Sequence, residues 1–240
     1  MSATDGWLWD VTRATHIAAG FVALVVGPAA MAARKGARWH RWWGRTYVAG
    51  MATVAVTAVG MAAVRPNPFL LLVAVFSFHL AFTGYRAIAR ARRGGAGWPD
   101  WAGAVIAAAG GVGLVAWALW PRAAGRPAVW VIAVVFGVIG VAVAVRELRG
   151  LVVPDPDRHA WRYRHLGNML GAYIATVSAF SAVNLTALPP VVRWLWPTAI
   201  GVPAIIALRA RERRRLGGGR RPAARGALAA VGAASPGRVD

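Results

Sequence analysis

RKGARWHRWWGRTY, residues 34–47, separates two long apolar runs near the start of the chain. The stretch holds five basic residues and three tryptophans. Short basic loops stay on the cytoplasmic side of a membrane, and tryptophan rings prefer the depth of the lipid headgroups. We therefore expect residues 34–47 to form a cytoplasmic hairpin loop that fixes the direction of the apolar segments on either side.

Composition places the chain among membrane proteins. Of its 240 residues, 58% are hydrophobic and 15% are charged, and the mean hydropathy is +0.50, whereas about a quarter of the residues in a soluble domain are charged. The net charge of +20 would indicate nucleic-acid binding in a soluble protein. Here the charges lie between apolar runs, so no nucleic-acid partner is expected. Because the chain has no cysteine, disulfides, thiolate metal sites and covalent c-type haem are excluded.

Seven apolar stretches are long enough to cross a membrane, since about 20 helical residues span the hydrocarbon layer. A helix of this length satisfies its own backbone hydrogen bonds in lipid. The sequence therefore predicts an all-α, polytopic bundle of seven transmembrane helices. The predicted spans are residues 14–33, 46–64, 69–89, 101–120, 128–145, 166–188 and 191–208.

The basic residues divide unevenly between the two sides of this bundle. With the N-terminus outside, 23 of the 28 Lys and Arg residues lie on the inner side, an excess that marks the cytoplasm. We therefore expect an outside N-terminus, a cytoplasmic C-terminus and a location in the bacterial inner membrane. Residues 1–208 would form the transmembrane domain, and residues 209–240 a basic, disordered cytoplasmic tail that attracts anionic lipids. Pro197 and Pro203 predict a kinked or partly re-entrant seventh span.

Polar residues inside the spans are the candidates for a binding site, because they are costly in lipid. His79 lies near the centre of the third span, with Arg86 two turns further on the same face, and we expect His79 to face the bundle and to hold a partner. All eight acidic residues fall in predicted loops, tails or span ends, which argues against a cation-coupled transporter and a membrane hydrolase. The ligand-binding candidates are His16, His40, His79, Arg86, His165, Asn168, Tyr173 and Asn184.

Three functions fit this layout. The leading hypothesis is a non-enzymatic integral membrane protein with a polar site near the cytoplasmic face, formed by His40, His165 and Asn168. The first alternative is a b-type haem protein for electron transfer, with His79 and His165 as iron ligands, because helix bundles hold haem between histidines. The second alternative is a small-molecule transporter built on the sixth and seventh spans. The chain has no glycine-rich phosphate loop, GxSxG or HExxH motif, so no catalytic residue is assigned.

The segment His16 to Met51, HIAAGFVALVVGPAAMAARKGARWHRWWGRTYVAGM, has a histidine that opens the first span, a Gly-Pro near its end, and a His-Arg-x-x-Gly-Arg-x-Tyr pattern. It resembles the uncharacterised bacterial membrane proteins of domain-of-unknown-function family 2306. A second stretch, His165 to Asn184, HLGNMLGAYIATVSAFSAVN, is similar to a late span of such proteins. The resemblance implies a multi-span membrane protein without an established activity. It adds interest to His16, His40, His165, Tyr173 and Asn184.

Overall fold

The computed structural model describes residues 3–120, 127–153 and 155–217. Across these ranges the chain forms seven α-helices and no strand, and all seven helices are long and apolar enough to cross a membrane. The predicted all-α, seven-span architecture is therefore confirmed. The helices are α1 (Ala3–Ala32), α2 (Arg38–Val64), α3 (Pro68–Arg93), α4 (Trp98–Ala118), α6 (Pro127–Val152), α7 (Ala160–Asn184) and α8 (Pro190–Gly217).

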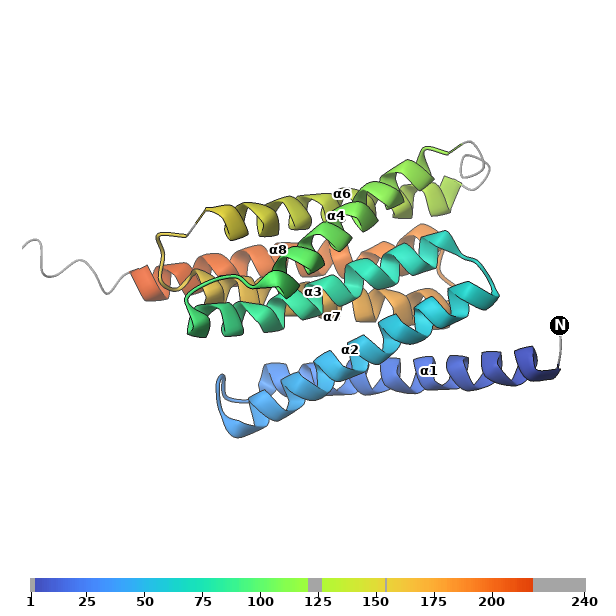
Figure 1. The fold of residues 1–240 in the computed structure, drawn as a ribbon, viewed down its shortest axis with the longest axis horizontal. Coiled ribbons are helices and arrows are strands. Elements are labelled where there is room, and N and C mark those ends of the chain that lie inside the picture. Colours follow the sequence, from blue (N-terminus) through green and yellow to red (C-terminus); the bar gives the residue numbers. More distant parts are fainter. Residues whose placement is uncertain (1–2, 121–126, 154, 218–240) are drawn as a thin grey trace, which may run out of the picture.

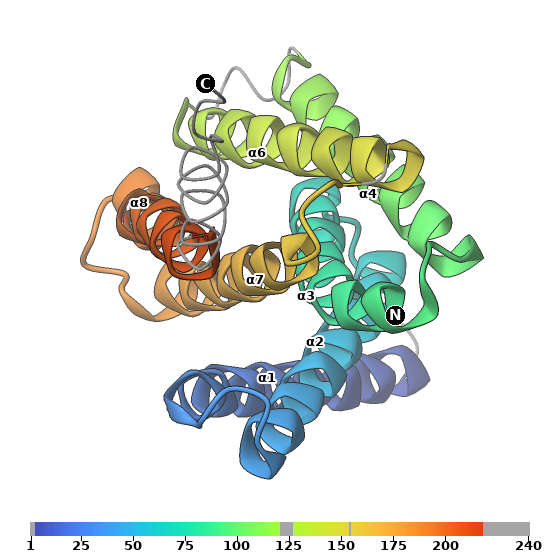
Figure 2. The same ribbon diagram turned by 90° about the vertical axis from the view of Figure 1, so that its left-hand side faces the viewer.

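The helices lie side by side and run alternately in opposite directions (Figure 1). α3 and α7 form the centre of the bundle, with α1 and α2 packed together on one side, α4 and α6 on the other, and α8 against α7 (Figure 2). The α1–α2, α3–α4 and α6–α7 connections and the C-terminal end of α8 share one end of the bundle, on the left in Figure 1. We call it the basic end, because the arginines and lysine of residues 34–45, 86–93, 146–164 and 209–215 belong to it.

Glycines allow the closest helix contacts in the bundle. A Cβ atom added to Gly111 of α4 would lie 2.8 Å from the backbone nitrogen of Val141 in α6. One added to Gly84 of α3 would lie 2.9 Å from Sδ of Met169 in α7. Small residues let helix backbones approach each other in lipid. These glycines therefore set the spacing between α4 and α6 and between α3 and α7.

An aromatic cluster fixes the N-terminal part of α8. The rings of Phe76 in α3 and Phe136 in α6 stack with their centroids 6.1 Å apart. Trp194 of α8 packs edge-on against Phe136 at 6.0 Å and against Phe69 of α3 at 5.5 Å. Such pairs add about 0.5–1.5 kcal/mol each beyond the burial of their area. The cluster thus holds the N-terminal part of α8 against α3 and α6. Other contacts position the half of α8 that lies at the basic end.

The loop expected at residues 34–47 is much shorter in the structure. α2 begins at Arg38, so His40, Trp42 and Trp43 belong to its first two turns. The chain reverses at Gly36 with φ +77°, a conformation that glycine adopts without steric cost. The predicted boundary at residue 46 is wrong because the helix extends about two turns into the basic, tryptophan-rich sequence that precedes the apolar run.

The last helix also differs from the expectation. α8 runs as one helix through Pro197 and Pro203, so the partly re-entrant path is wrong. Each proline removes one backbone N–H donor. The helix nevertheless continues past both prolines to Gly217, beyond the predicted boundary at residue 208. The remainder of the predicted tail, residues 218–240, lies outside the described residues.

Candidate functional site

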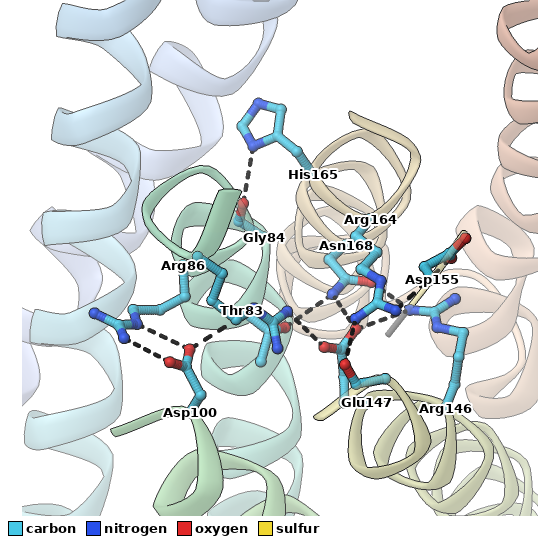
Figure 3. Close-up of polar contacts among 12 residues, drawn as sticks. Thr83, Gly84, Arg86, Asp100, Arg146, Glu147, Asp155, Arg164, His165 and Asn168 are labelled. Atoms are coloured by element: carbon cyan, nitrogen blue, oxygen red, sulfur yellow. Dashed lines mark hydrogen bonds and ion pairs between the residues drawn. The ribbon is translucent and has the colours of Figure 1, made fainter. Parts of the chain in front are cut away.

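Polar and charged side chains meet inside the bundle at its basic end (Figure 3). They come from the C-terminal halves of α3 and α6 and from the N-terminal ends of α4 and α7, which alternating helix directions bring to the same depth. Each contributing helix is otherwise apolar enough to span lipid, so these groups must satisfy one another. We call this set the polar cluster; its members are Thr83, Arg86, Arg90, Asp100, Arg146, Glu147 and Asn168.

Asp100 joins α3 to α4 within the polar cluster. It stands in the first turn of α4, where its Oδ2 accepts a hydrogen bond of 2.9 Å from the backbone nitrogen of Gly97 and so caps the helix. Arg86 of α3 donates from Nε to Oδ1 at 2.9 Å and from Nη2 to Oδ2 at 2.6 Å. Asp100 is 3% exposed, and this two-pronged contact gives it the pairing that a buried carboxylate requires.

Glu147 is the second buried carboxylate, and only 1% of it is exposed. Arg90 of α3 donates from Nη2 to its Oε2 at 2.9 Å, and Asn168 of α7 donates from Nδ2 to its Oε1 at 3.0 Å. The same Asn168 nitrogen lies 2.9 Å from Oγ1 of Thr83. The expectation that no carboxylate lies within a span is wrong here, because α6 continues to Val152 and carries Glu147 inside the span.

Arg146 gives the polar cluster an excess of positive charge. Together with Arg86 and Arg90 it makes three arginines for two carboxylates. Arg146 donates from Nη2 to Oδ1 of Asn168 and lies 3.6 Å from Oε1 of Glu147, which Arg90 already pairs. Its Nε is buried, and within the described ranges this atom has no hydrogen-bond partner. One arginine of the cluster is therefore incompletely neutralised.

Arg209 of α8 adds a further positive charge beside the polar cluster. Its side chain packs over Gly167 of α7, where an added Cβ would lie 3.3 Å from Cδ of the arginine. Arg209 is close enough to Arg146 and Glu147 to interact with both electrostatically. Its Nε is also buried and lacks a hydrogen-bond partner in the part of the chain that the structure describes.

A cavity of about 210 Å³ opens between α3, α6, α7 and α8 next to these two arginines. Arg146, Asn168 and Arg209 line its basic end, and apart from Thr198 the remaining side chains of the lining are apolar. Along α6 the lining extends from Phe136 to Arg146, a helical rise of about 15 Å. The volume is several times the roughly 30 Å³ that a water molecule occupies in the liquid. The cavity is therefore elongated along the bundle, with a cationic end and an apolar end.

His40 and His165 lie against each other at the basic end, on the other side of α7. Their ring centroids are 6.2 Å apart and the planes meet at 77°. Nδ1 of His40 lies 2.9 Å from the carbonyl oxygen of Ala30 in α1, and Nδ1 of His165 lies 2.9 Å from that of Gly84 in α3. Of the three residues in the leading sequence hypothesis, these two come together. Asn168 instead belongs to the polar cluster.

The other candidate residues are dispersed over the bundle. Nδ1 of His16 in α1 lies 2.9 Å from Oγ1 of Thr57 in α2. Tyr173 of α7 donates its hydroxyl to the carbonyl oxygen of Leu24 in α1 at 3.3 Å. Asn184 is exposed at the opposite end of α7 and donates to a carbonyl of its own helix. These contacts hold helices together and bring no further candidate to the basic end.

His79 is buried, as expected, and 4% exposed. Neither ring nitrogen makes a hydrogen bond within the described residues, so the expected partner is not found among them. Its side chain lines an apolar cavity of about 430 Å³ between α2, α3 and α4, whereas His165 packs against Gly84 and His40. The two histidines proposed as iron ligands thus face different surroundings, and the haem alternative gains no support.

Sequence reasoning missed the residues that complete the polar cluster and the cationic end of the cavity. One signal was present in α3, where the face that carries His79, Thr83 and Arg86 continues to Arg90 at helical spacing. No comparable feature of the sequence indicates that Arg90 contacts a helix far away in sequence. The missed residues are Arg90, Asp100, Arg146, Glu147 and Arg209.

These features define a multi-pass membrane protein with a charged cluster buried in its helix bundle. The chain matches the family described as "Predicted membrane protein (DUF2306)" over residues 13–145, more than half of its length, and it belongs to that family. The resemblance read from His16 to Met51 is thereby confirmed. The match covers most of α1 to α6 and ends before the stretch from His165 to Asn184. No curated protein and no solved structure matches the chain.

Proposed function

We propose that this protein binds an anionic amphiphile, a molecule with a carboxylate or phosphate headgroup and an apolar chain, in the cavity between α6, α7 and α8. The basic end would lie in the cytoplasm and the N-terminus outside, with the protein in the bacterial inner membrane. The observation that carries the proposal is the position of Arg146 and Arg209. They approach from two helices at one end of a cavity whose other lining residues are apolar except Asn168 and Thr198.

Charge complementarity supports an anionic headgroup. Two arginines side by side repel each other unless an anion lies between them, and Glu147 is already paired with Arg90 and Asn168. Carboxylates and phosphates match the planar donors of a guanidinium group. A headgroup at this position would accept hydrogen bonds from the buried Nε atoms of Arg146 and Arg209. It would therefore satisfy donors for which the described residues supply no acceptor.

The shape and surroundings of the cavity support an apolar chain. Side chains such as Ile139, Val143 and Val202 line it beyond the arginines. α8 is the least buried of the described spans, and it packs mainly against α7. An apolar chain would remove the exposed cavity walls from contact with water, at about 25 cal/mol for each Å² covered. Anionic lipids attracted to the basic end would provide a local source of such molecules.

The test is ligand binding by the purified protein in nanodiscs of phosphatidylcholine, which has no net charge. Oleate should bind in a one-to-one ratio, and oleyl alcohol, with the same chain and no charge, should bind about tenfold or more weakly. Phosphatidylglycerol tests whether a two-chain lipid is also accepted. Inorganic phosphate, which lacks a chain, should bind too weakly to compete with oleate.

A substitution of Arg209 tests the proposal most directly. Within the described residues Arg209 makes no hydrogen bond or ion pair whose loss would unfold the bundle. Arg209→Gln should weaken oleate binding by about tenfold or more, while Arg149→Gln, an exposed arginine of α6, should leave it unchanged. Equal effects of the two substitutions would contradict the proposal. So would equal binding of oleate and oleyl alcohol, since the arginines would then contribute nothing to recognition.

A further inference from the structure

The rings of His40 and His165 are both fixed by backbone carbonyl groups. The carbonyl oxygens of Ala30 and Gly84 can only accept hydrogen bonds, so Nδ1 of each ring carries the proton. When the ring is neutral, Nε2 then carries a lone pair, and neither Nε2 atom has a hydrogen-bond partner in the described part of the chain. Histidines that bind metal ions are oriented in the same way, by a hydrogen bond from the other ring nitrogen.

The separation of the two rings decides what can lie between them. A ring nitrogen is about 1.15 Å from the ring centre, so a direct N–H···N hydrogen bond of about 2.9 Å holds two centroids at most about 5.2 Å apart. Two bonds of about 2.0 Å to one metal ion extend that limit to about 6.3 Å. The centroids of His40 and His165 are 6.2 Å apart. This distance excludes a direct hydrogen bond and lies near the upper limit for two ligands on opposite sides of one ion.

The surroundings of the pair select the type of ion. Zinc sites are tetrahedral with three or four protein ligands, and no group of three or more His, Cys, Asp or Glu side chains suited to a metal occurs within the described residues. Lys35 lies close enough to His165 to act on it electrostatically, which disfavours a divalent cation. A monovalent ion that accepts two ligands on opposite sides suits these conditions, and Cu(I) is such an ion.

A soft donor lies one helical turn from His165. Met169 follows His165 by one turn of α7, and its Sδ packs against Gly84, the residue whose carbonyl oxygen orients the His165 ring. Thioether sulfur favours Cu(I), and imidazole binds copper well. We propose that His40 and His165 bind one Cu(I) ion through their Nε2 atoms, independently of the cavity beyond α7. The site would allow the protein to take up copper at the basic end of the bundle.

The test is competition for Cu(I) with a coloured Cu(I) chelator, under reducing conditions, using detergent-purified protein without a histidine tag. The protein should withdraw one equivalent of Cu(I), and His40→Asn or His165→Asn should weaken binding by about a hundredfold. Asparagine keeps an N–H donor near the position of Nδ1 and removes Nε2, so each variant can retain its contact with the carbonyl group. His16→Asn, near the middle of α1 and away from the pair, is the matched control and should bind Cu(I) like the unaltered chain.

Thermal unfolding shows whether the variants are folded. Cu(I) should raise the unfolding temperature of the unaltered chain and of His16→Asn, and it should not raise that of His40→Asn or His165→Asn. Failure of the unaltered chain to withdraw Cu(I) would overturn the proposal. Retention of Cu(I) by folded His40→Asn and His165→Asn, or tighter binding of Zn²⁺ than of Cu(I), would also overturn it.

Discussion

Glu147 of α6 and Asn168 of α7 share a hydrogen bond of 3.0 Å at a point where each residue is 1% exposed. Arg90 of α3 completes the pairing of Glu147, and Thr83 of the same helix accepts from Asn168. One carboxylate and one amide therefore join α3 to the consecutive helices α6 and α7. In a membrane, where apolar contacts between helices compete with equally apolar lipid, such polar contacts help to specify which helices associate.

Replacing Glu147 should destabilise the bundle strongly. Glu147→Gln removes the negative charge, leaves Arg146 without a carboxylate neighbour and leaves Arg90 with only Asp100 at 3.9 Å. Breaking a buried ion pair in this way typically costs about 3–5 kcal/mol. Thermal unfolding followed by tryptophan fluorescence would measure the loss. The control is Glu212→Gln on α8, whose ion pairs with Arg162 and Arg215 are 3.9 Å long and should contribute about 0–1 kcal/mol. A similar small effect of both substitutions would contradict a structural role for Glu147.

Arg86→Lys should also destabilise the protein, although it keeps the charge. A lysine cannot reproduce the two parallel hydrogen bonds from Arg86 to Asp100, so we expect a loss of about 1–3 kcal/mol in the free energy of unfolding. Arg92→Lys, at the exposed end of α3, should be neutral. In a double-mutant cycle, Arg86→Gln and Asp100→Asn together should cost less than the sum of the single substitutions. Additive costs would show that the pair is not coupled.

The α4–α6 contact can be tested with two glycines of one helix. Gly111→Ala should destabilise the bundle by about 1–3 kcal/mol, because its Cβ would meet the backbone nitrogen of Val141 at 2.8 Å. Gly113→Ala should be tolerated, since its Cβ would lie 3.5 Å from the nearest atom of Leu72, an ordinary contact distance. Thermal unfolding of the two variants checks the difference. Equal stability would show that α4 and α6 are not held at this spacing.

Hydropathy predicted the seven spans because each helix carries an uninterrupted apolar run, and it failed where helices continue into polar sequence. The apolar run of α6 ends at Val145, so hydropathy places Glu147 in a loop, whereas the helix continues to Val152. Which groups meet at the basic end depends on helix neighbours, and a single sequence does not specify them. His79 shows a second limit: its burial follows from its position in α3, whereas its lack of a hydrogen-bond partner within the described residues depends on how α2 and α4 surround it.

Cysteine labelling would test the proposed orientation, and the natural chain is suited to it because it contains no cysteine. Pro66→Cys lies in the exposed α2–α3 connection, and Ala96→Cys in the exposed α3–α4 connection at the basic end. With the basic end in the cytoplasm, a membrane-impermeable maleimide should label Pro66→Cys in cells whose inner membrane is intact, and Ala96→Cys only after lysis. The unaltered chain should remain unlabelled in both conditions. The reverse pattern would place the basic end outside, and the arginines of the cavity would then face a compartment without the cytoplasmic pool of anionic amphiphiles.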